Sequence, residues 1–379
     1  MIFSLEALQA DQGDSLLLHY GLDDAPRLIV VDGGPSGVYK RSLRPRLDEL
    51  KQARSPDEPL PLQLVMVSHI DDDHVVGILD LTNQLVQERR DGVESAYRIL
   101  ALWHNSFDDL LGSDALAAAP AEVSALASGA GPADLPISAP ARAVVASIGQ
   151  GRALRDNAAA LGLSGDPRGG DLLCGPKTFD WGEGLELLVV GPGAERLQDL
   201  QERWDEDVRK RKLSPTRVAG YLDRSVYNLS SLVVLVTMKG KTMLLTGDAR
   251  GDDILDGLKA AGLLDKPPLE VDLLKLPHHG SDRNVETDFF RNVVADHYVV
   301  SSDGTDHNPE MAALRMISEA RDDDDFALHL TNRTGKNDLG RRLAAFQRSE
   351  RRRKRDYEIR FREDAARSIT VDLLEPPGS

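Results

Sequence analysis

The sequence predicts an α/β protein in which helices pack on mixed β-sheet. Short segments rich in Val, Leu and Ile alternate with segments of helical periodicity along most of the 379 residues. Apolar residues make up 41% of the chain and charged residues 28%, which are ordinary values for a globular protein. A chain of this length can bury a large core, as one elaborated domain or as two.

The N-terminal part is predicted to be a β-meander that leads into alternating strands and helices. The expected strands, each apolar and bounded by turn residues, cover 2–8, 15–20, 28–31, 62–68 and 98–103. Leu43, Leu47 and Leu50 recur at helical spacing within 41–54, and a second helix is expected over 77–90.

The C-terminal part repeats this alternation. The expected strands cover 185–192, 228–236, 242–246, 271–276, 297–301 and 326–331, with further strands between 357 and 373. The expected helices cover 194–213, 251–262 and 309–320. We therefore expect one domain in two halves, 1–106 and 181–379, with an insertion at 107–180.

Four side chains that can bind metals follow the strand at 62–68: His69, Asp71, Asp73 and His74. Side chains alternate along an extended segment, so the first three are expected to point one way, with His74 following as the chain turns into the next helix. Two imidazoles and two carboxylates at one place suit two divalent cations. A solvated acidic turn is the alternative.

This stretch resembles the His-x-His-x-Asp-His motif of the metallo-β-lactamase superfamily, with Asp71 where a second His is usual. The variant is similar to that of the hydrolase domain of the competence protein ComEC and its stand-alone relatives. Three further segments agree with it, namely 11–18, 244–248 and 274–281. The resemblance covers about residues 1–320 and implies a metallo-β-lactamase-like αββα sandwich of two mixed sheets, with 107–180 as an inserted helical or loop segment.

The later motifs supply further candidates. The resemblance implies that Asp248 bridges two metals and that His307 is the late histidine ligand, although Asn308 stands between His307 and the following Pro. Neighbouring side chains diverge, so at most one of His278 and His279 is expected to face the metals. The other could orient ligands or contact substrate. The remaining candidates are Asp14 and Asp32, as groups that orient ligands or form turns, and Ser281 as a substrate contact.

The predicted chemistry is hydrolysis by a water that two metal ions activate. The expected ligands are His69, Asp71, Asp73, His74, Asp248 and His307, and the expected catalytic residues are Asp73, Asp248 and His279. Three carboxylates among six ligands make Mn²⁺ or Fe²⁺ competitive with Zn²⁺. The resemblance implies a phosphodiesterase that acts on nucleic acid, DNA first.

Two alternatives remain open. A hydrolase of a lactone, small phosphoester or cyclic nucleotide is one, and the net charge of −16 favours such a small substrate. The other is a subunit of a defence or stress system that is regulated by a partner protein, for example a protease.

The insertion suggests a lid over the site. Ala, Gly, Pro and Ser dominate residues 115–141, which predicts a loop or weak helices that a protease would cut first. Arg152 and Arg155 could hold a phosphate through forked hydrogen bonds. Surface arginines on an alanine-rich helix are the other explanation.

The overall charge argues against a protein that coats nucleic acid non-specifically. The basic run 351–355 is expected to be a solvated face, with contact to a polyanion as the alternative. A single cysteine, Cys174, excludes an internal disulfide. Without a run of about 20 apolar residues or a secretory signal, we expect a cytoplasmic protein with no membrane contact.

Overall fold

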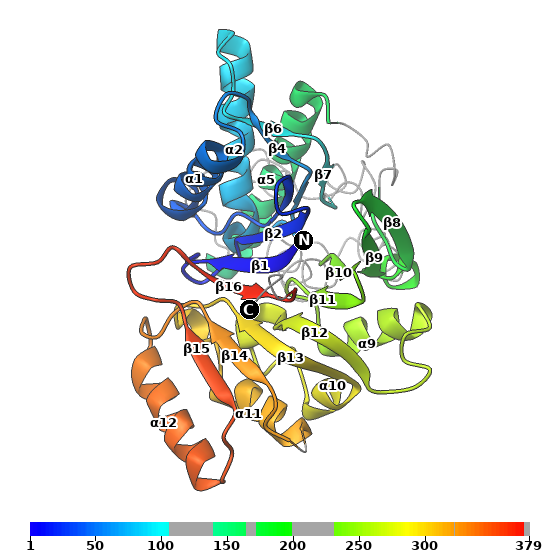
Figure 1. Cartoon of the computed structure of the whole chain (residues 1–379), viewed down its shortest axis with the longest axis vertical. Coiled ribbons are helices and arrows are strands. Elements are labelled where there is room, and N and C mark those ends of the chain that lie inside the picture. The colour runs from blue at the N-terminus through cyan, green and yellow to red at the C-terminus, as the bar shows by residue number, and fades with distance from the viewer. Residues whose placement is uncertain (106–138, 164–171, 199–230, 322, 375–379) are drawn as a thin grey trace.

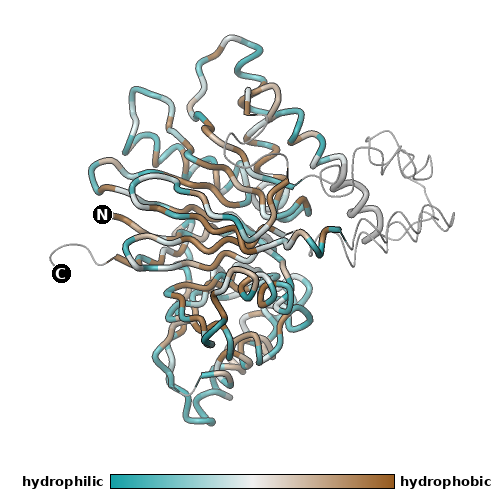
Figure 2. The backbone as a smooth tube through the Cα atoms, turned by 90° about the vertical axis from the view of Figure 1, so that its right-hand side faces the viewer, coloured by the Kyte–Doolittle hydropathy of each residue, from teal (hydrophilic) through white to brown (hydrophobic). Residues whose placement is uncertain are grey.

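A computed structural model describes residues 1–105, 139–163, 172–198, 231–321 and 323–374. Two β-sheets lie face to face, and helices cover the outer side of each (Figure 1). Hydrophobic residues run along the central strands, and hydrophilic ones gather on the outer helices and loops (Figure 2). The expected αββα sandwich of two mixed sheets is confirmed.

The first sheet has six described strands in the order β16-β1-β2-β3-β5-β7. Their bounds are β1 Ile2–Leu8, β2 Leu16–Gly21, β3 Pro26–Val31, β5 Leu64–Met66, β7 Leu102–Trp103 and β16 Ser368–Asp372. The meander β1 to β3 is antiparallel, whereas β3, β5 and β7 pair in parallel. Two short strands, β4 (Leu60–Leu62) and β6 (Tyr97–Ile99), pair beside this sheet.

The second sheet has eight described strands, ordered β15-β14-β13-β12-β11-β10-β9-β8. Their bounds are β8 Lys177–Gly182, β9 Leu185–Gly191, β10 Val233–Met238, β11 Lys241–Leu245, β12 Leu269–Lys275, β13 Val293–Val300, β14 Ala327–Leu330 and β15 Glu358–Phe361. Strands β8 to β11 are antiparallel and β11 to β15 are parallel. Loops at the carboxyl ends of the parallel strands are the usual place for ligand-binding residues.

Helices bury their apolar faces on the two sheets. A short π-helix, Tyr39–Leu43, continues into α1 (Arg44–Arg54), which with α2 (Asp72–Asp91) and α5 (Ala139–Leu161) covers the first sheet. The second sheet is covered by α9 Gly251–Ala260, α10 Thr287–Asn292, α11 Met311–Ala320 and α12 Leu339–Arg352.

Three hydrophobic clusters correspond to these layers. One fills the space between the sheets and includes Phe3, Trp103 and Leu273. The second lies between the first sheet and its helices, and the third between the second sheet and its helices. Apolar burial of this extent is the main stabilising term of such a fold.

Several elements differ from expectation. Helix α2 begins at Asp72 rather than 77, so Asp73 and His74 lie in its first turn, where carboxylates interact well with the helix dipole. Strand β8 begins inside the range expected for the insertion and pairs with β9. Most of 107–180, including nearly all of 115–141, and most of the helix expected at 194–213 lie outside the described residues. None of the described helices has both the length and the hydrophobicity needed to cross a bilayer.

Candidate metal centre

The loop after β5 carries the first four candidate ligands. The backbone is extended only as far as Asp71, which caps α2 with φ −74° and ψ 149°. The strand-like alternation expected for 69–73 therefore ends at Asp71, and Asp73 and His74 enter the site from the first helical turn. The loop packs on the N-terminal turn, because Asp14 N–H donates to the carbonyl oxygen of Asp73 at 3.2 Å. A Cβ atom on Gly13 would overlap this oxygen, so the contact requires glycine.

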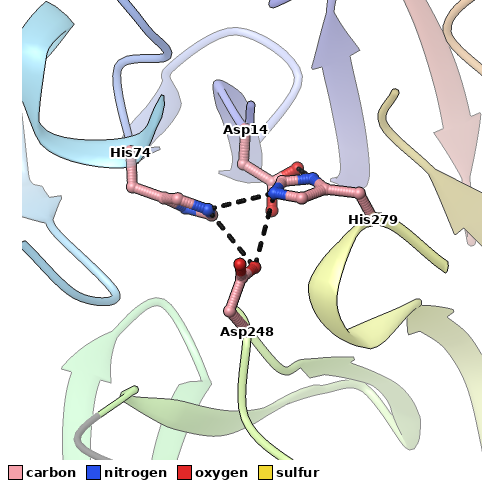
Figure 3. A group of neighbouring side chains, drawn as sticks. All are labelled: Asp14, His74, Asp248 and His279. Carbon is pink, nitrogen blue, oxygen red and sulfur yellow. Dashed lines mark hydrogen bonds and ion pairs between the residues drawn. The ribbon is translucent and has the colours of Figure 1, made fainter. Parts of the chain in front are cut away.

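Three atoms in the centre form a nearly regular triangle. His74 Nε2 lies 3.3 Å from His279 Nε2 and 3.3 Å from Asp248 Oδ1, and His279 Nε2 lies 3.5 Å from Asp248 Oδ1 (Figure 3). Four ligands placed tetrahedrally about 2.0–2.1 Å from a zinc ion are about 3.3 Å apart. A carboxylate oxygen of Asp73 lies 3.5 Å from His279 Nε2 and completes a donor set on this side of Asp248.

The other oxygen of Asp248 meets a second group of donors. His278 Nε2 lies 3.7 Å and His69 Nε2 3.9 Å from Asp248 Oδ2. Asp71 Oδ2 lies 3.5 Å from His69 Nε2. Asp248 thus stands between two clusters of nitrogen and oxygen donors, one facing each of its oxygens.

Hydrogen bonds fix the orientation of the three buried imidazoles. The Nδ1 atoms of His74, His279 and His69 lie 2.9 Å from Asp32 Oδ2, 3.0 Å from the Ser301 carbonyl oxygen and 3.2 Å from Ser68 Oγ, respectively. In a neutral ring with its proton on Nδ1, Nε2 carries the lone pair. All three rings therefore present Nε2 to the centre, which is the arrangement that surrounding groups impose on histidine ligands.

The charges in the centre shift several pKa values. Burial lowers the pKa of His74, but the carboxylates of Asp248, Asp32 and Asp73 outweigh burial and raise it well above its usual range. The same balance, with Asp248 and Asp14 as the main partners, raises the pKa of His279 to about 10. Burial raises the pKa of Asp248, but the surrounding imidazoles outweigh it and hold this pKa well below its ordinary value. Divalent cations would replace the protons that balance these carboxylates.

The residues present fit divalent metal ions. Four buried residues, Asp14, His74, Asp248 and His279, bring one donor atom each to within 4.8 Å of the others. His69 Nε2, Asp14 Oδ1 and Asp248 Oδ1 are buried and have no hydrogen bond within the described chain. Buried polar atoms without partners are rare, and a bound ion is one arrangement that would satisfy these three.

Both adjacent histidines approach the centre, contrary to our expectation for a strand. His278 and His279 have φ values of 46° and 55°, so side-chain alternation does not apply to them. Their rings are nearly perpendicular, at 87°. His279 is buried, whereas the His278 side chain is 30% exposed and lies where a substrate could reach it.

The structure does not bring His307 to this centre. His307 is exposed, and no carboxylate of the described residues lies within ion-pair distance of its ring. The residues Asp306 and His307 have φ values of 51° and 66°, and Arg342 donates to the His307 carbonyl oxygen, which holds the loop at the surface. In this structure His307 therefore lies apart from the other candidate ligands, and its role as a ligand stays a prediction. The extra Asn308 lies in this irregular loop.

The substrate-binding candidates lie outside the two donor clusters. Arg155 is exposed and lies 3.5 Å from Asp156, which fits a solvated helix face, and Arg152 is half-buried on the same helix. Ser281 is buried and accepts a hydrogen bond from Arg283 N–H. On α5, the Gln150 amide donates to Asp72 at 2.5 Å, and Gly151 packs against Ile70 of the metal loop.

Sequence reasoning missed one charged residue. Lys275 is 1% exposed, and its Nζ lies 2.6 Å from Asp14 Oδ2. The signal was a lysine between Leu274 and Leu276 at the end of β12, three residues before His278. A buried lysine almost always has a charged partner.

The comparisons with known proteins give distant structural similarities and no sequence match. No family model and no curated protein matches the chain. Similar solved structures include a protein from Parabacteroides distasonis described as a metal-dependent hydrolase, at 10% identity and a TM-score of 0.32, with 86% of this chain and 98% of that chain covered. Another is Zn²⁺-bound PqqB from Methylobacterium extorquens, at 12% identity and a TM-score of 0.41, with 98% of this chain and 100% of that chain covered. A mutant of CmlA β-hydroxylase has 10% identity and a TM-score of 0.39, with 97% of this chain but 54% of that chain covered.

Proposed function

We propose that the chain is a metal-dependent hydrolase, and more narrowly a phosphodiesterase that cleaves DNA. The observation that carries the hydrolase proposal is the position of Asp248, whose two oxygens each face a separate set of donors. A carboxylate so placed can join two divalent cations, and paired cations lower the pKa of a shared water and neutralise negative charge on the reacting group.

The donor clusters assign the metal-binding residues. His74, His279 and Asp73 would hold one ion, and His69, Asp71 and His278 the other, with Asp248 shared. Asp32 and the Ser301 carbonyl keep two of the imidazoles in the required orientation. Zn²⁺ and Mn²⁺ both accept this mixture of nitrogen and oxygen donors.

The accessible side of the centre is formed by three residues. The side chains of Asp71, Asp73 and His278 are 33%, 27% and 30% exposed, whereas the other proposed ligands are buried. Substrate therefore enters past these three side chains. His278 Nδ1 is buried and has no hydrogen bond within the described residues.

DNA as the substrate rests on the similarity of four sequence segments to the hydrolase domain of ComEC. The second candidate is a small phosphoester, cyclic nucleotide or lactone, which the net charge of −16 favours because a polyanion is repelled at long range.

A substrate panel tests the proposal. Purified protein with Mn²⁺ or Zn²⁺ is assayed on linear DNA, RNA, bis(p-nitrophenyl) phosphate, a cyclic nucleotide and a lactone, with an Asp248→Asn variant as the matched control. We expect cleavage of DNA and of the small phosphodiester, and none by the variant. Lactone or cyclic nucleotide turnover without DNA cleavage selects the second candidate. Equal activity of the variant would disprove the assignment of Asp248.

A further inference from the structure

One helix of this acidic protein carries a local excess of positive charge. Residues 339–355, which are α12 and the turn after it, contain eight arginines and lysines and one carboxylate, a formal balance of +7. The chain as a whole carries −16, so the other 362 residues carry −23. Segregation of charge to this degree marks a surface for a polyanion more often than for a neutral partner.

Half of these cations are engaged inside the protein. Arg353 lies 3.2 Å from Glu319 and 3.0 Å from Glu350, and Arg355 lies 2.6 Å from Asp324. The remaining engaged ones are Arg341, paired with Asp338 at 4.0 Å, and Arg342, which donates to the carbonyl oxygens of His307 and Pro309. The one carboxylate of the segment, Glu350, is buried and accepts from Ser318.

The other four cations form what we name the α12 basic surface: Arg348, Arg351, Arg352 and Lys354. All four are exposed, and within the described chain none has an ion pair or a side-chain hydrogen bond. No carboxylate of 339–355 reaches this surface, because Glu350 points into the core. The surface therefore keeps its full positive charge.

Stabilisation of the helix explains only part of this surface. Cations in the last turn of a helix interact favourably with its dipole, and this accounts for Arg351 and Arg352. Arg348 lies before the last turn and Lys354 beyond it. The helix dipole therefore does not account for these two cations. Arg348, Arg351 and Arg352 are three and four positions apart, which puts them on one helix face with Cβ atoms about 5–6 Å apart.

We propose that the α12 basic surface binds the phosphate backbone of a nucleic acid strand. Guanidinium groups bind phosphate oxygens through two parallel hydrogen bonds. All four side chains are cations, and cations bind the phosphate backbone whatever the base sequence.

This proposal rests on the proposed function in one respect, since it names the substrate class of the same enzyme. The surface is separate from the metal centre. The N-terminal end of α12 adjoins the His307 loop, and Arg348 to Arg352 lie about 14 to 20 Å further along the helix axis at 1.5 Å per residue. The surface can therefore hold only a strand that extends well beyond the point of cleavage.

The test measures how binding depends on salt. A fluorescent phosphorothioate oligonucleotide of about 30 residues, which resists cleavage, is titrated with full-length protein at about 25 to 200 mM KCl. The test variant combines Arg348→Gln, Arg351→Gln, Arg352→Gln and Lys354→Gln. The control variant combines Arg90→Gln, Arg98→Gln, Lys239→Gln and Lys266→Gln, four exposed cations elsewhere, so that both lose the same net charge.

Each lost phosphate contact reduces the slope of log affinity against log salt by about 0.7 for a single strand. For the test variant, we expect the magnitude of this slope to fall by about 3 and the affinity at low salt to fall at least tenfold. The control variant should keep the wild-type slope. Equal slopes for the two variants would overturn the proposal. A dimer of the wild type that the test variant dissociates, with DNA binding unchanged, would assign the surface to a second copy instead.

Hydrolysis of bis(p-nitrophenyl) phosphate separates this proposal from the proposed function. This substrate is too small to contact α12 while it is bound at the metal centre, so the test variant should keep wild-type turnover. If the wild type cleaves no phosphodiester but its DNA binding depends on the α12 basic surface, the proposed function fails and the present inference stands. Identical melting curves of the variants would show that the substitutions leave the fold intact.

Discussion

Lys275 and Asp14 form an ion pair that is entirely enclosed by protein, with 2.6 Å between Nζ and Oδ2 and 1% exposure of each side chain. Burial alone would raise the pKa of Asp14, but the Lys275 ammonium and the His279 imidazole outweigh it and hold this pKa well below its usual range. The second oxygen of Asp14 lies 3.5 Å from His279 Nδ1. The pair thus sets both the position of Asp14 and the charge behind a proposed metal ligand.

Lys275→Met should strongly destabilise the metal-free protein. The substitution leaves a buried carboxylate without its cation, and breaking a buried pair in this way costs about 3–5 kcal/mol. Lys275→Met combined with Asp14→Asn should recover most of this loss, because neither partner then carries a charge. Urea unfolding of the metal-free proteins measures both free energies. A double variant as unstable as the single one would show that Lys275 acts through packing.

Metal content should separate Asp73 and His74 from His307. Elemental analysis should find close to two divalent ions in the wild type and in His307→Ala, because His307 is exposed and away from the donors. Asp73→Ala or His74→Ala should lose at least one ion. Loss of an ion from His307→Ala would show that its loop closes onto the centre when metal binds.

Asp248→Ala should abolish hydrolysis and lower the melting temperature of the metal-free protein. The imidazoles around Asp248 hold its pKa well below the ordinary value, so removing this carboxylate leaves buried His74 and His279 without their main counter-charge. Calorimetry and the activity assay check the two parts separately. Wild-type turnover of the variant with Mn²⁺ supplied would exclude Asp248 as a ligand.

Acid should destabilise the protein through His329. This residue is 1% exposed, with Nε2 3.2 Å from His297 Nδ1, and burial together with the charges of His297 and Arg360 lowers its pKa to about 3. Since the folded pKa lies below the unfolded value of about 6.5, the stabilisation is complete above that pH and is lost as pH falls towards 3.

Each pH unit within that window should cost about 1.4 kcal/mol from this group. Unfolding free energies at about pH 7 and pH 5 should therefore differ less in His329→Gln than in the wild type. His307→Gln, at an exposed position, serves as the matched control and should keep the wild-type difference. If the unfolding free energy of His329→Gln changed between these two pH values as much as that of the wild type, the acid sensitivity would belong to other groups.

The sequence predicted the parts of this structure that depend on local pattern. Apolar strands and amphipathic helices follow from periodicity, and most described elements lie where expected. The sequence also named five candidate donors, His69, Asp71, Asp73, His74 and Asp248, the first four from residues that follow a strand end and Asp248 from the family resemblance. The structure brings all five together.

What could not be predicted depends on backbone conformation and on contacts between distant segments. His307 lies away from the site in a loop with left-handed φ values. His278 and His279 also have left-handed φ values, and there this conformation lets both side chains approach the site. Asp14, the partner of Lys275, is 261 positions away in sequence, so no local pattern predicts this ion pair. The role of the segment 107–180 stays a prediction, since most of it lies outside the described residues.

The pairing of β1 with β16 has a consequence for synthesis of the protein. Ser4 pairs with Asp372, so β1 receives its second neighbour from a strand 368 positions later in the chain. Until that strand has been synthesised, β1 can join β2 but keeps one edge open, and open edges invite pairing with other chains. Completion of the first sheet therefore waits for β16.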